Sequence, residues 1–72
     1  MSEHWEDMQE VNAFAEKMKR KLSASFKKGR HGWRTCEPDL LRKMLKEHVE
    51  KGDPVDVANF CMMLSYMDEG TK

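Results

Sequence analysis

The sequence predicts an all-α fold, a small domain of three helices at about residues 3–26, 38–51 and 54–67, with the last two forming a helical hairpin. Two observations carry this prediction. Apolar residues recur at steps of three and four, and Pro, Gly and capping residues stand where the helices should begin and end. No strand-like alternation and no internal repeat are present, and 72 residues are enough for one domain, residues 1–72.

The first helix is predicted from one apolar stripe. Its members are Trp5, Met8, Val11, Phe14, Ala15, Met18, Leu22 and Phe26, spaced as on one helical face. Ser2 is a suitable N-cap. Acids fill the first turns and bases the last, as the helix dipole favours, so much of the charge segregation is ordinary helix electrostatics.

The second and third helices are predicted from their boundary residues. Pro38 suits a first turn and Gly52 a position just past a helix end. Asp53 is a suitable N-cap, followed by Pro54 at the first helical position and Asp56 two residues later. The short link at Lys51 and Gly52 makes the two helices antiparallel neighbours.

The third helix carries apolar residues on every side, including Val55, Phe60, Met63 and Met67. Such a helix is normally buried on every side, and we do not expect two neighbouring helices in one copy to cover it. We therefore expect a symmetric homodimer in which the third helices, with or without the second, form a shared bundle.

Composition limits the functional classes. The chain has 13 Lys and Arg against 13 Asp and Glu, no apolar run near the ~20 residues of a membrane span, and an acidic start unlike a signal peptide. Cys36 and Cys61 form neither a disulfide framework nor a zinc-ligand pattern. We expect a soluble cytoplasmic protein without membrane contact.

The neutral sum hides a cationic block. Residues 17–34 hold eight Lys or Arg and no acid, whereas residues 1–16 hold five acids and neither base. A loop at 27–36 contains the candidate ligand-binding residues Lys28, Arg30, His31, Trp33 and Arg34. The loop could hold a phosphate while Trp33 stacks on a base; alternatively, Trp33 folds back over the core and the cations are solvated.

Four carboxylates in the hairpin, Glu47, Glu50, Asp53 and Asp56, form a candidate magnesium site, since Mg²⁺ favours carboxylates together with substrate phosphates. Helix geometry opposes it, because Glu50 points roughly 170° from the core direction at ~100° per residue. Capping also accounts for Asp53 and Asp56. The cofactor is therefore Mg²⁺ or none.

Three segments carry a family resemblance: Lys28–Trp33, Leu40–Glu47 and Asp56–Met63. Together they resemble the MazG-like nucleotide pyrophosphohydrolases, most closely the short versions found in phage and prophage genomes, over about residues 14–64. The resemblance implies an all-α, usually oligomeric protein that cleaves nucleoside triphosphates with Mg²⁺.

By position, the resemblance assigns the metal ligands to Glu47 and Glu50 and to Asp53 and Asp56. It places Asn59 within reach of ligand or water, and Arg30 and Trp33 near the nucleotide. In the family a longer stretch separates the two acidic pairs, whereas here only Lys51 and Gly52 do. We therefore expect reduced or lost catalysis.

Three functional hypotheses follow. The first is a homodimer that binds a nucleotide, a nucleic-acid end or a protein partner through the basic loop, without full catalysis. The alternative is a Mg²⁺-dependent nucleoside triphosphate pyrophosphohydrolase that uses the acidic hairpin. A further alternative is an interaction subunit whose Met-rich third helix docks a partner. Nucleic-acid binding is the weaker candidate, because the overall charge is not basic.

Overall fold

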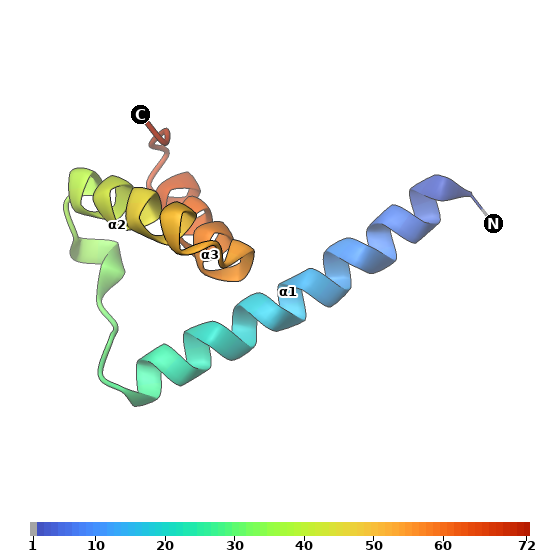
Figure 1. The fold of residues 1–72 in the computed structure, drawn as a ribbon, viewed down its shortest axis with the longest axis horizontal. Coiled ribbons are helices and arrows are strands. Elements are labelled where there is room, and N and C mark those ends of the chain that lie inside the picture. Colours follow the sequence, from blue (N-terminus) through green and yellow to red (C-terminus); the bar gives the residue numbers. More distant parts are fainter. Residues whose placement is uncertain (1) are drawn as a thin grey trace.

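The computed structural model describes residues 2–72 and shows three α-helices in the predicted places (Figure 1). Helix α1 spans Glu3–Lys27, α2 spans Pro38–Lys51 and α3 spans Pro54–Tyr66, with a short 3₁₀ helix, η1, at Trp33–Thr35. No strand is present in residues 2–72. The all-α fold with a helical hairpin is confirmed.

Local capping explains both ends of α1. The Ser2 hydroxyl accepts the Trp5 backbone N–H at 3.2 Å. At the other end, Gly29 has φ of 83° and its N–H donates to the Phe26 carbonyl at 2.9 Å, while the Arg30 N–H donates to the Ser25 carbonyl at 3.0 Å. These two bonds are a Schellman motif, whose left-handed residue is most easily a glycine.

The hairpin turn also follows the sequence expectation. Gly52 has φ of 88°, and its N–H donates to the carbonyls of His48 and Val49. The carboxylate of Asp53 then caps α3 by accepting the N–H of Val55 at 2.9 Å and that of Asp56 at 3.5 Å. The chain thus reverses within two residues, which brings α2 and α3 together.

The core is small and lies between α2 and α3. Its buried residues are Leu41 and Leu45 of α2 and Met63 and Leu64 of α3. Helix α1 contributes no fully buried residue; Leu22 is its half-buried contact with the core. Trp33 and Cys36 close the core from the segment between α1 and α2.

Helix α3 is covered more completely within one chain than its composition suggested. None of its residues from Val55 to Leu64 is exposed, because α2 packs on one side and α1 on another. Only Asn59, Met63 and Leu64 of α3 are fully buried, however, and Tyr66 at its end is exposed. The predicted homodimeric core stays a prediction.

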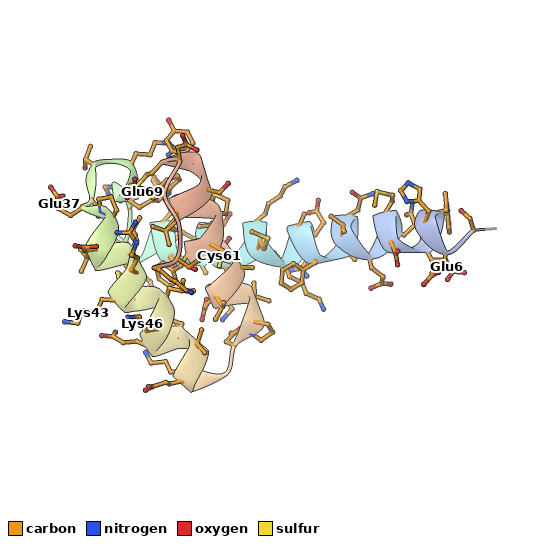
Figure 2. All side chains as sticks on the ribbon, turned by 90° about the horizontal axis from the view of Figure 1, so that it is seen from above. Glu6, Glu37, Lys43, Lys46, Cys61 and Glu69 are labelled. Atoms are coloured by element: carbon orange, nitrogen blue, oxygen red, sulfur yellow. The ribbon has the colours of Figure 1, made fainter. Side chains whose placement is uncertain are left out.

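The exposed apolar surface lies largely elsewhere, on α1. The N-terminal half of this helix projects beyond the hairpin, as Figures 1 and 2 show, and Glu6 stands on it far from the other helices (Figure 2). Trp5, Met8 and Val11 are exposed along it. Within residues 2–72, no helix combines the length and hydropathy that crossing a bilayer requires.

The chain after α3 folds back on α2. Asp68 has φ of 59°, and the Glu69 N–H donates to the Leu64 carbonyl at 2.9 Å. The half-buried Arg42 of α2 then holds this segment, donating to the Gly70 carbonyl at 3.0 Å and to the Glu69 carboxylate at 2.7 Å. Arg42 also donates to the Asp39 carboxylate at 2.6 Å. This bond, and next the one to Glu69, raise the pKa of Arg42.

Candidate functional site

The basic segment, residues 27–36, presents its cations to solvent. The side chains concerned are exposed and make no ion pair within the described chain: Lys27, Lys28, Arg30, His31 and Arg34. Gly29 and Gly32 both have positive φ, near 85°, and reverse the chain between α1 and η1. The segment is a bend that concentrates unpaired positive charge.

Trp33 does not point outward from this segment. Its half-buried indole packs against the core cluster and meets the Tyr66 ring edge-on, with 5.3 Å between ring centroids. The Arg34 guanidinium lies over the indole at 4.5 Å from its centroid. Of the two alternatives for Trp33, the structure shows the one in which it folds back over the core.

The Arg34 side chain is therefore held by two aromatic rings. Its guanidinium lies over Trp33 and also 5.2 Å from the Tyr66 ring centroid, an arrangement stabilised by the attraction between a cation and an aromatic face. The His31 ring similarly lies 5.3 Å from that of Phe26. Arg34 and His31 thus each have an aromatic neighbour, and Lys28 and Arg30 lie exposed on the same bend.

The predicted acidic hairpin is divided between two faces. Asp53 and Asp56 face α1, where the Lys21 ammonium lies 2.8 Å from the carboxylate of Asp53 and 3.6 Å from that of Asp56. A cation of the chain itself thus occupies the position between these two carboxylates. The hydrogen bond from Lys21, and next the backbone N–H of Val55, hold the pKa of Asp53 below its ordinary value.

Glu47 and Glu50 are exposed on α2 and line an open depression of about 440 Å³. Lys43 and Lys46 line it too, pointing away from α1 (Figure 2). Across residues 2–72, no group of three or more His, Cys, Asp or Glu side chains is placed to hold one metal ion. The structure therefore does not bring the four predicted metal ligands together in one chain.

Asn59 lies in the interface between α3 and α1. It is 5% exposed, and its Nδ2 donates to the Met18 carbonyl at 3.2 Å. Its Oδ1 is buried without a hydrogen-bond partner among the described residues. The structure gives Asn59 a place in helix packing, and its role in ligand binding stays a prediction.

Three residues of these sites were not found from the sequence: Lys21, Arg42 and Tyr66. Lys21 meets an acid 32 residues further along the chain, and Arg42 meets one 27 residues away. No local pattern carries such pairings. Tyr66 looked like one more apolar residue of α3, although its place at the end of that helix opposite Trp33 defines the environment of Arg34.

Comparisons with protein-family models, with curated proteins and with solved structures found no match to this chain.

Proposed function

We propose that this protein is a small MazG-like helical protein of the phage or prophage type. As a homodimer, it binds a phosphate-bearing ligand of the nucleotide class through residues 27–36, with catalysis reduced or lost. The observation that carries the proposal is the exposed, unpaired positive charge of this segment. Guanidinium groups and ammonium groups are the side chains that bind phosphate oxygens.

The arrangement of Arg34 supports this function. A guanidinium stacked on Trp33 has lost part of its rotational freedom before any ligand arrives, which lowers the entropic cost of binding. Arg30 and Lys28 add donors on the same bend. Because the Trp33 ring face is covered by Arg34, recognition is expected to depend on phosphate groups more than on the base.

The placement of Lys21 supports reduced catalysis. Phosphoryl transfer in this class needs divalent cations to neutralise the developing charge, and the residues offered for that purpose are Asp53 and Asp56. Lys21 already lies between them, and its single positive charge offsets one of their two negative charges. Glu47 and Glu50 face another direction, among lysines.

Titration calorimetry with pyrophosphate, ATP and dATP tests the proposed ligand. We expect binding that weakens as salt rises, since each phosphate contact displaces counterions. The double variant Lys28→Glu, Arg30→Glu should lose at least about tenfold in affinity, because each lost charged contact contributes ~1.5–3 kcal/mol. The matched control is Lys43→Glu, Lys46→Glu, which reverses two exposed lysines on α2 and should bind as the wild type does. Equal losses in both variants would contradict the assignment.

Pyrophosphate release from nucleoside triphosphates, with and without Mg²⁺, tests the expectation of reduced catalysis. We expect no turnover above background. Mg²⁺-dependent turnover that disappears in a folded Asp56→Asn variant would overturn the expectation and favour the pyrophosphohydrolase alternative.

A further inference from the structure

Helix α1 exposes large apolar side chains near both of its ends. Trp5 is 46% exposed, Met8 44% and Val11 61% in the projecting half, and Phe26 is 65% exposed in the last turn. A monomeric domain of this size has little reason to leave an indole and a phenyl ring in water, since contiguous exposed apolar groups mark interaction surfaces.

Trp5 and Phe26 lie on the same side of α1. They are separated by 21 residues, which is three heptads, and Met8, Ala15 and Leu22 share the adjoining positions of the same repeat. Met18 and Lys21, which contact α3, lie about 80° and 140° round the helix from Phe26 at ~100° per residue. The side with Trp5, Met8 and Phe26 is therefore beside α3 rather than under it. These three side chains are exposed, whereas Ala15 is half-buried and Leu22 packs against the core cluster.

The charges of α1 select the occupant of this face and its direction. Residues 3–16 carry five acids and no Lys or Arg, and residues 17–27 carry five bases and no acid. A second α1 running parallel would set acids beside acids and bases beside bases. A second α1 running antiparallel would set each acidic half beside the basic half of its partner, and opposite charges at such separations attract.

We propose that the face of α1 formed by Trp5, Met8 and Phe26 is the interface with a second copy of this chain, whose α1 lies antiparallel. Trp5 of one copy then lies at the level of Phe26 of the other, and the acidic half of each helix lies along the basic half of its partner. The inference rests on the homodimer of the proposed function and assigns its interface to α1, in place of the third helices that the sequence suggested.

Sedimentation equilibrium with single variants tests the interface. Wild-type protein should be dimeric at ~100 µM. The dissociation constant of the dimer should increase as the salt concentration rises. Trp5→Lys should raise the dissociation constant at least about tenfold, as loss of a central aromatic anchor does. Helices α2 and α3 should stay folded, because Trp5 is not part of the core cluster. Val49→Lys is the matched control: Val49 is 57% exposed on α2, and its replacement should leave the dimer intact.

Spin labels test the direction of the helices. In a Cys36→Ser, Cys61→Ala background, a label at Ala13→Cys should lie about 8 Å along the helix axis from its partner label, and one at Glu6→Cys about 28 Å, from a rise of 1.5 Å per residue. Two similarly short separations would indicate parallel helices and overturn the proposal.

The outcomes separate the interface from the proposed function. A monomer at ~100 µM would overturn both this interface and the homodimer. A dimer that tolerates Trp5→Lys but is disrupted by Val49→Lys would overturn the interface and leave the homodimer standing. Phosphate-ligand binding is measured separately, by calorimetry with the Lys28→Glu, Arg30→Glu variant.

Discussion

At the scale of single residues, Asp53 combines three tasks. Its carboxylate caps α3, accepts a hydrogen bond from Lys21 and thereby fastens the hairpin to α1. An N-cap alone would need only the local N–H groups. The pairing with Lys21 also raises the pKa of that lysine, first through the hydrogen bond to Asp53 and then through the charge of Asp56.

This arrangement predicts a loss of stability in acid. The pKa of Asp53 is lower in the folded chain than in the unfolded one, so its contribution is present above the unfolded pKa of about 3.9 and is lost as pH falls through the lower folded value. Urea denaturation at pH 7, 5 and 3 should show a decline below about pH 4. Asp53→Asn should reduce that decline, whereas the exposed, unpaired Asp7→Asn should not. An identical decline in both variants would contradict the role of Asp53.

Asp68 is the one non-glycine residue with a positive φ among residues 2–72. It has φ of 59° at the end of α3, in the left-handed region that costs an ordinary L-residue about 1–2 kcal/mol. Asp68→Gly removes this cost, and the greater freedom of glycine in the unfolded chain offsets about 0.4–1 kcal/mol of the gain. We expect thermal denaturation to show a net stabilisation of up to about 1 kcal/mol, while Asp68→Val should destabilise.

At the scale of elements, the helix boundaries could be predicted and the contacts between helices could not. Ser2, Gly52, Asp53 and Pro54 act on backbone groups within a few residues, so the chain alone reveals them. The direction of Trp33 depends instead on Tyr66, 33 residues later. The third helix illustrates the same limit, because its apolar composition did not show that α1 would pack on one of its sides.

The candidate site likewise has one part that could be predicted from the sequence and one part that could not. Its basic segment could be predicted, since it is continuous in sequence and its cations remain exposed. The acidic hairpin looked like one cluster because four carboxylates are close in sequence, but helix geometry turns Glu47 and Glu50 away from Asp53 and Asp56. Lys21, distant in sequence, changes the charge balance of the second pair.

The packing of α1 on α3 yields a prediction at Asn59. Its Oδ1 is buried without a partner, so Asn59→Leu removes an unsatisfied oxygen along with the bond to Met18 and should change the unfolding free energy by less than about 1.5 kcal/mol. Asn59→Asp places a carboxylate oxygen beside the Met18 carbonyl and should cost about 3 kcal/mol or more. Chemical denaturation measures both.

The same pair of variants tests the ligand role predicted for Asn59. A folded Asn59→Leu protein that binds pyrophosphate normally would leave Asn59 with the packing role alone. A folded Asn59→Leu protein that no longer binds would support the prediction that the amide reaches the ligand.

At the scale of the whole molecule, the net charge is zero, but the positive and negative charges lie on different parts of the surface. An acidic projecting helix half, a cationic bend at residues 27–36 and a mixed face on α2 are all present in 72 residues. Among residues 2–72, only four apolar side chains are buried, all in α2 and α3. The core of a domain this small rarely supplies more than about 3–5 kcal/mol, so association would add appreciably to the stability of the fold by mass action.

The projecting half of α1 has a consequence for amide hydrogen exchange. Residues 7–13 form helical hydrogen bonds, but their side chains are outside the core cluster, and a helical segment this short is marginal in water without packing. In dilute solution their amides should exchange with deuterium nearly as fast as those of a free peptide, far faster than those of α3. If a second copy covers the segment, the protection of its amides should rise with protein concentration, while that of α3 changes less. Deuterium uptake at individual amides of residues 7–13 would then show which of them the dimer covers.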